Sequence, residues 1–159
     1  MNTLTKITRL IQNRVMSLRM VAVGDTFEKM KRVARDASKK VGKEISLEIG
    51  GADTEIDKIM VDALSDPLIH IMRNAIDHGL EDSAEDRVAA GKTEVGIITL
   101  RAFHRGGNIA IEVSDDGRGI NRDKVFNKAV ERGLIQEDDD LTDGQVFALI
   151  MQAGFSTAD

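Results

Sequence analysis

The N-terminal part of the chain contains two stretches in which apolar residues recur with helical spacing. From residue 3 to about 21 they fall on the a and d positions of a heptad, with Arg14 as the exception. This pattern predicts an amphipathic helix with an apolar seam that can face a partner. Asp25 and Glu28 then form a capping-box pattern ahead of a second helix, which we expect to end near Gly42.

The middle of the chain changes from a period of two residues back to a helical period. Apolar and polar residues alternate over 44–49, which predicts a half-buried strand. Residues 54–79 have helical spacing, but Pro67 in their midst lacks the amide hydrogen that an interior helix position donates. We therefore predict two helices that meet at Pro67, the second one capped by Asp66.

The remaining patterns complete an α+β fold. They predict a short capped helix over 83–91, a hairpin of strands 97–103 and 109–114, and helices over 121–133 and 143–153. This order of elements predicts a two-layer α/β sandwich of helices on a sheet, preceded by the amphipathic helix.

Composition narrows the class of protein. The 159 residues are 42% hydrophobic and 31% charged, as in soluble globular domains. The absence of cysteine excludes disulfides and thiolate metal sites. No apolar run approaches the roughly 18 residues that span a bilayer, so we expect a cytoplasmic protein without direct membrane insertion.

Charge is divided unevenly along the chain. Residues 1–43 carry a net charge of +8 and residues 44–159 a net charge of −13. A solvated basic helical face beside an acidic domain is the favoured interpretation, and a nucleic-acid-binding arm at 1–43 is the alternative. Since the only aromatic residues are five phenylalanines, a base-stacking surface is not favoured, and we expect no nucleic-acid partner.

One candidate site lies on the predicted helix after Pro67. His70, Asn74, Asp77 and His78 are expected on one face of it, because spacings of three and four residues bring helix side chains within about 5–6 Å. An imidazole nitrogen and an amide oxygen there would suit a magnesium ion that keeps several waters and takes its other ligands from nucleotide phosphates. A merely solvated polar face explains the same stripe equally well.

A second candidate site follows the last predicted strand, in the run Asp-Asp-Gly-Arg-Gly-Ile at 115–120. Its glycines allow the backbone to approach a ligand closely. A carboxylate fixed at a strand end, here Asp115, can accept a hydrogen bond from an exocyclic amino group such as that of adenine. Taken alone, the run is a weak signal, because Asp-Gly turns are frequent and a simple tight loop is the favoured interpretation.

Three motifs in this order resemble the ATP-binding domain of the chemotaxis histidine kinases. They are His70-x-x-Arg73-Asn74-x-x-Asp77-His78-Gly79, the run at 115–120, and Gly154-Phe155-Ser156-Thr157. The resemblance covers nearly all of the chain. It implies the fold of the ATPase superfamily that includes gyrase and the heat-shock chaperones, with ATP and Mg²⁺ as cofactors. It also implies a histidine protein kinase, which transfers the γ-phosphoryl group of ATP to a histidine in a two-component phosphorelay.

The resemblance also implies roles for single residues. Asn74 corresponds to the magnesium-binding asparagine, with His70 as a further magnesium contact or a base, so both are candidate catalytic and metal-binding residues. Asp115 corresponds to the aspartate that reads adenine. The other residues expected at the nucleotide are Asp77, His78, Gly117, Gly119, Phe155 and Thr157. For Asp77, a structural ion pair or a helix cap is an equally compatible role.

The resemblance further implies how the chain is organised. Residues 1–24 would be the end of a dimerisation helix and a linker, and residues 25–159 the N-terminal portion of the ATP-binding domain. Because the family's second glycine box does not follow, we expect the domain to be incomplete at its C-terminus.

Implied partners are ATP or ADP and a second copy in a homodimer. Parts outside this chain would contact a phosphoacceptor-histidine domain, response regulators, a coupling protein and chemoreceptors. The alternative is a non-catalytic nucleotide-binding module that dimerises through its first helix.

Overall fold

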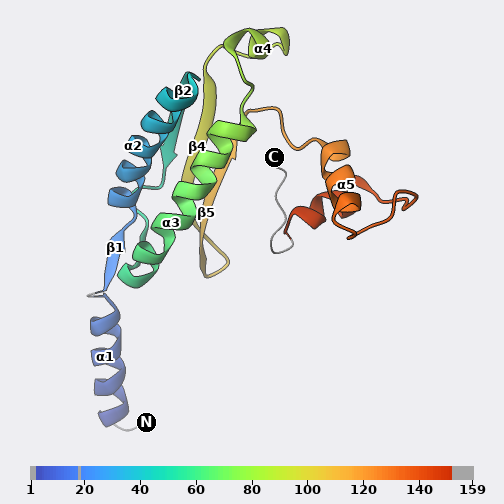
Figure 1. Cartoon of the computed structure of the whole chain (residues 1–159). Coiled ribbons are helices and arrows are strands. Elements are labelled where there is room, and N and C mark those ends of the chain that lie inside the picture. The colour runs from blue at the N-terminus through green and yellow to red at the C-terminus, as the bar shows by residue number, and fades with distance from the viewer. Residues whose placement is uncertain (1–2, 18, 152–159) are drawn as a thin grey trace. The chain divides into compact units, whose positions relative to one another are not determined.

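The computed structural model describes residues 3–17 and 19–151. The chain divides into two compact units, Met1–Gly117 and Arg118–Asp159. Figure 1 labels the main helices and strands of the two units. None of the helices in the described part of the chain is both long enough and apolar enough to cross a membrane.

The first unit contains a mixed three-stranded sheet. Its elements are α1 (Thr3–Ser17), β1 (Met20–Ala22), α2 (Gly24–Val41), β2 (Ile45–Gly50), β3 (Glu55–Asp57), α3 (Lys58–Asn74), the π-helical turn η1 (Ala75–Gly79), α4 (Ala84–Ala89), β4 (Gly96–Arg105) and β5 (Asn108–Asp115). The sheet order is β2-β4-β5, with β2 parallel to β4 and β4 antiparallel to β5. Strands β1 and β3 form a separate antiparallel pair. Helices and sheet together confirm the predicted α/β class.

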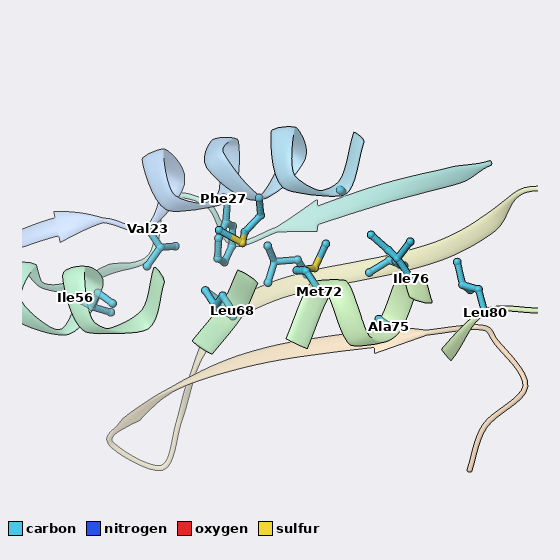
Figure 2. Packing of buried hydrophobic residues seen from close by; sticks show 13 residues of the cluster. Val23, Phe27, Ile56, Leu68, Met72, Ala75, Ile76 and Leu80 are labelled. Atoms are coloured by element: carbon cyan, nitrogen blue, oxygen red, sulfur yellow. The ribbon is translucent and has the colours of Figure 1, made fainter. Parts of the chain in front are cut away.

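The core of this unit lies between the two long helices and the sheet. Figure 2 shows Phe27 of α2 near Leu68 and Met72 of α3. Ile98 and Leu100 of β4 belong to the same buried cluster and are fully buried. The buried positions of each helix recur every three to four residues, which is the spacing of a single helix face. The core therefore anchors α3 with its opposite face exposed.

Both predicted N-terminal helices are present, but the end of the first and the cap of the second differ from the prediction. The first helix ends at Ser17, and Met20 and Val21 belong to β1, because this segment pairs with β3. Helix α2 follows Val23 without a side-chain cap, so the predicted capping box at Asp25 is wrong. Its end at Gly42 is confirmed, since this residue has a φ of 70°, which glycine adopts without strain.

The predicted break at Pro67 is also wrong. Helix α3 runs through Pro67, and its N-terminal cap is Asp57, which accepts the N–H of Ile59 at 2.8 Å. An interior proline costs a helix about 3 kcal/mol. Burial of Leu68 and Met72 beyond it offsets this cost, because each buried side chain of this size contributes about 1.5–3 kcal/mol.

The predicted short helix and hairpin are confirmed. Ser83 caps α4 by accepting the N–H of Asp86 at 3.1 Å. Gly106 and Gly107 join β4 to β5 with φ values of 54° and 82°. Positive φ at both residues of a two-residue loop matches the twist of a hairpin, which is why glycine occupies both positions.

The second unit contains two predicted helices, α5 (Arg122–Glu131) and α6 (Asp143–Ala148), and the 3-10 turn η2 (Leu149–Met151). Asn121 caps α5, as its predicted start requires. Arg122 Nε donates to Asp143 Oδ1 at 2.8 Å and so links α5 to the start of α6. The last helix was predicted over 143–153, but its α-helical part ends at Ala148 and continues as the 3-10 turn η2. Residues 152–153 of that prediction lie outside the described residues.

Candidate functional site

The exposed face of α3 brings His70 and Asn74 together. Nδ2 of Asn74 lies 3.3 Å from Nδ1 of His70, and both residues are exposed. This confirms the proximity predicted from their spacing of four residues. The contact uses the amide nitrogen, so Oδ1 of Asn74 is the atom that can meet a cation.

Directly after Asn74 the helix widens into the π-helical turn η1, which carries Asp77, His78 and Gly79. Ile76 is completely buried in η1, whereas Asp77 and His78 are exposed. Leu80, which follows the turn, is also buried. The core thus holds the turn on both sides of the two polar residues.

A lysine from the segment between α2 and β2 supports this turn. Nζ of Lys43, which precedes β2, donates to the carbonyl oxygens of Ile76 at 3.0 Å, Asp77 at 2.9 Å and Leu80 at 3.1 Å. The side chain of Lys43 is only 8% exposed. Since the last carbonyls of a helix lack partners within it, Lys43 supplies the donor that they need. Sequence reasoning did not foresee this contact, because a lysine just after a helix carries no signal of it.

The two predicted sites meet at three residues. Oδ1 of Asp115, at the end of β5, accepts the N–H of Gly117 at 3.0 Å. A Cβ on Gly79 would lie 3.1 Å from the Asp115 carboxylate, and a Cβ on Gly117 would overlap the carbonyl oxygen of Gly79. Only glycine fits at 117, because the chain's own backbone fills the space there. We call Gly79, Asp115 and Gly117 the motif junction.

A buried arginine binds two acidic residues that follow Gly79 and Asp115 in the chain. Arg87 of α4 is 3% exposed and donates to Glu81 Oε2 at 2.8 Å and to Asp116 Oδ2 at 2.7 Å. It also donates to the carbonyl oxygens of Thr93 and Val95. Asp116 accepts the N–H of Ile97 at 2.9 Å through its other carboxylate oxygen. The four hydrogen bonds from Arg87 use all three nitrogens of its planar guanidinium.

Lys92 joins the same group. Its Nζ donates to Glu81 Oε1 at 2.6 Å and to the backbone oxygens of Asp116 at 2.8 Å and Gly117 at 2.7 Å. Sequence reasoning placed Arg87 in the predicted short helix over 83–91 and missed this group, because the partner Asp116 is distant in the sequence.

The charges of this group shift its pKa values. The hydrogen bond to Asp116 raises the pKa of Arg87 against the opposing effect of burial. Burial acts to raise the pKa of Glu81, but hydrogen bonds led by that from Lys92 outweigh it and lower the pKa. Burial acts likewise on Asp116, where the hydrogen bond from Arg87 leads the interactions that lower its pKa. All three groups are therefore charged at neutral pH.

Three predicted site residues are not among the described residues of the first unit. Gly119 belongs to the second unit and has a φ of 69°. Phe155 and Thr157 lie outside the described residues. Their predicted contacts with a nucleotide stay predictions.

The donor atoms on α3 fit a magnesium ion that is held mainly by a nucleotide. No group of three or more His, Cys, Asp or Glu residues within the described ranges is placed to hold a metal. Magnesium, however, binds proteins through one or two oxygen ligands and keeps waters and phosphates as the others. The exposed amide oxygen of Asn74 meets this requirement.

Comparison with known proteins identifies the family. Residues 63–157, more than half of the chain, match the family described as histidine kinase-, DNA gyrase B-, and HSP90-like ATPase. The chain belongs to this ATPase family. The matched segment includes most of α3, the whole of η1 and β5, and the loop after β5, which together carry His70, Asn74 and the motif junction. The superfamily implied by the three sequence motifs is thereby confirmed.

Curated relatives cover almost the whole chain. The chemotaxis protein CheA of Listeria monocytogenes is 45% identical over 98% of this chain, and that of Rhizobium meliloti is 49% identical over 98%. CheA of Klebsiella aerogenes is 45% identical over 100% of it. The chain spans only 25%, 20% and 24% of these relatives' lengths, respectively. A solved histidine kinase domain from Erythrobacter litoralis EL346 blue-light activated histidine kinase is 18% identical, with a TM-score of 0.45 over 82% of this chain and 54% of that chain.

Proposed function

We propose that this chain binds ATP with a magnesium ion where α3 and η1 meet the end of β5, as the ATP-binding domain of a chemotaxis histidine kinase. The motif junction carries this proposal, because it brings η1, which continues α3, against the Asp-x-Gly-x-Gly motif. Family membership and the likeness to the CheA proteins support the same function. That likeness does not favour the alternative of a non-catalytic module.

In this proposal Asp115 reads the base. One of its carboxylate oxygens, Oδ1, already accepts the N–H of Gly117 and so orients the side chain. The second oxygen accepts the amino group of adenine, and a charged acceptor makes this hydrogen bond stronger than a neutral one would. The base then lies at the end of β5, and the phosphates extend toward α3.

Asn74 and His70 act at the phosphate end. Oδ1 of Asn74 is the proposed magnesium ligand, and His70 keeps the amide oriented through its Nδ1 contact. The proposed catalytic role of His70 is to contact the ion directly or to act as a base. Asp77 and His78 lie on the following turn, near the phosphates. When bound, the ion neutralises charge on the phosphates.

The proposed reaction belongs to the longer protein. A histidine nitrogen of the phosphoacceptor domain attacks the γ-phosphorus, the bond to the bridging oxygen breaks, and ADP leaves. Positioning of the nucleotide by this chain is its contribution to such a transfer. Gly119, Phe155 and Thr157 are proposed to contact the nucleotide as well. The proposed setting is the cytoplasm, with response regulators, a coupling protein and chemoreceptors as partners of the other domains.

Helix α1 is proposed to dimerise the protein. Its Leu4, Ile7, Leu10 and Ile11 are 51% to 73% exposed, as expected for a seam that a second copy would cover. The proposed division into a dimerisation segment, 1–24, and an ATP-binding part, 25–159, follows from this assignment.

Equilibrium binding of ADP with and without magnesium tests the proposed function. The Asp115→Asn variant should bind ADP at least tenfold more weakly than the wild type, because loss of a charge-assisted hydrogen bond costs about 1.5–3 kcal/mol. The Asp53→Asn variant serves as the matched control, since Asp53 is exposed in the turn between β2 and β3. Wild-type ADP binding that persists unchanged in Asp115→Asn would contradict the assignment of the base site.

A further inference from the structure

We infer that four charged side chains, Glu81, Arg87, Lys92 and Asp116, act together as a positioning group that sets Asp115 for adenine. We call these four residues the charged brace. The inference rests on the proposed function and extends it, because Glu81, Arg87 and Lys92 lie outside the motifs that suggested nucleotide binding, and Asp116, within the run at 115–120, was given no role there. Their role would be to control affinity and base selectivity by fixing the loop that carries Asp115.

The first observation is where the brace joins the chain. Glu81 comes two residues after Gly79, and Asp116 directly follows Asp115. Arg87 bridges these two acids, at 2.8 Å and 2.7 Å, through the two terminal nitrogens of one guanidinium. A single planar group thus ties the segment after η1 to the end of β5. The guanidinium of Arg87 therefore helps to set the distance in space between the two motifs.

The second observation concerns the backbone of the Asp115 loop. Lys92 holds the carbonyl oxygens of Asp116 and Gly117, while Ile97 of β4 exchanges two hydrogen bonds with Asp116, one backbone and one to its carboxylate. Gly117 is also the residue that packs against the carbonyl of Gly79 and donates to Asp115. Tilting the peptide at Gly117 would therefore move the carboxylate of Asp115.

The third observation is that Arg87 and Glu81, at the centre of the brace, are buried, whereas the side chains of Lys92 and Asp116 are 30% and 36% exposed. The side chains of Arg87 and Glu81 are 3% and 10% exposed. Every buried side-chain nitrogen or oxygen in the described part of the chain has a hydrogen-bond partner. Burying charges is costly, and apolar side chains of similar size often serve stability as well or better. A geometric role for the brace explains why charges with defined directions occupy these positions.

Adenine selectivity separates this role from a general structural one. Adenine has an amino group that can donate to Asp115, whereas hypoxanthine has a carbonyl oxygen at that position. A misplaced Asp115 should weaken ADP binding much more than IDP binding. General loosening of the site would weaken both nucleotides by the same factor.

The test measures dissociation constants of the full chain for ADP and IDP with magnesium. Lys92→Met should bind ADP about tenfold more weakly than the wild type, with a much smaller change for IDP. Lys92→Arg should restore part of the ADP preference, since it keeps a donor. Lys58→Met is the matched control, because Lys58 is exposed and pairs only with Asp62 of the same helix in the described contacts. Arg87→Lys provides a second variant, which keeps the charge and loses the planar geometry.

Each outcome has a defined meaning. Reduced preference for ADP over IDP in Lys92→Met and Arg87→Lys, with Lys58→Met unchanged, supports the charged brace. Wild-type preference in both variants overturns it, and so does equal weakening of ADP and IDP. A wild-type chain that binds neither nucleotide overturns the proposed function, and the brace with it. Lost preference in Asp115→Asn alone leaves the proposed function standing and rejects the brace.

Discussion

At the scale of single residues, the motif junction explains why glycine occupies position 117. Its neighbour is the backbone carbonyl of Gly79, which cannot turn aside as a side chain can. Sequence reasoning expected the glycines of this motif to make room for a ligand. In the structure the room at Gly117 is taken by the chain itself, a close contact between two motifs that the sequence separates.

The Gly117→Ala substitution tests this contact. It should destabilise the chain by about 1–3 kcal/mol, the usual cost of overpacking, and it should weaken ADP binding. Gly144→Ala is the control, because no atom lies within 4 Å of a Cβ added there. Urea unfolding and ADP titration measure the two effects. Equal stability of Gly117→Ala and the wild type would show that the loop can move away freely.

Some contacts of the site were predictable from the sequence and others were not. The contact between His70 and Asn74 was predictable because helix geometry brings residues four apart together. The contacts of Lys43 with the backbone around η1 and of Arg87 with Asp116 were not, since they join residues 29 to 37 positions apart through tertiary packing. Local spacing carries no information on such pairs.

At the scale of elements, the patterns predicted the helices and strands better than their ends. Strands β2, β4 and β5 and helices α2 and α5 lie where period and glycine signals placed them. The short strands β1 and β3 were missed, because three residues are too few to establish a period. Pro67 misled the prediction, as tertiary burial outweighed a local preference.

The turn η1 depends on Lys43, which leads to a second prediction. In Lys43→Met, three backbone carbonyls lose the hydrogen bond from Lys43, so the free energy of unfolding should fall by about 1–3 kcal/mol. The amide of Leu80, which donates to Ala75 across the turn, should exchange with solvent faster. Lys40→Met is the control, because Lys40 is exposed on the last turn of α2. Unchanged exchange at Leu80 would contradict the support of η1 by Lys43.

At the scale of the whole molecule, the charged brace makes stability depend on pH. The folded-state pKa values of Glu81 and Asp116 lie below their ordinary values of 4.5 and 3.8. A lowered pKa means that the folded state binds fewer protons than the unfolded state. Their contribution is therefore fully present above those ordinary values and is lost as the pH falls through the folded-state values.

The free energy of unfolding should consequently decline as the pH is lowered below 4.5, the ordinary value for Glu81. Urea unfolding at a series of pH values measures this decline. Glu81→Gln should be less stable at neutral pH, because Arg87 loses a charged partner, and should show a shallower decline in acid. A decline as steep in Glu81→Gln as in the wild type would assign the acid sensitivity to other carboxylates.

Family and fold were both accessible from the sequence, because the motifs at 70–79 and 115–120 retain their order and spacing. That they meet in one place was an expectation of the resemblance alone. The structure supplies the physical contact, through Gly79, Asp115 and Gly117.

Backbone amide spectra of the chain, recorded during titration with ADP and magnesium, test the central claim most directly. The account predicts that the amide signals of Asn74, Gly79 and Gly117 shift together and saturate with one dissociation constant. The amide signals of α2 should change little, because that helix lies outside the proposed site. Shifts confined to α2, or no shift at Gly79 and Gly117 at saturating nucleotide, would contradict binding at the motif junction.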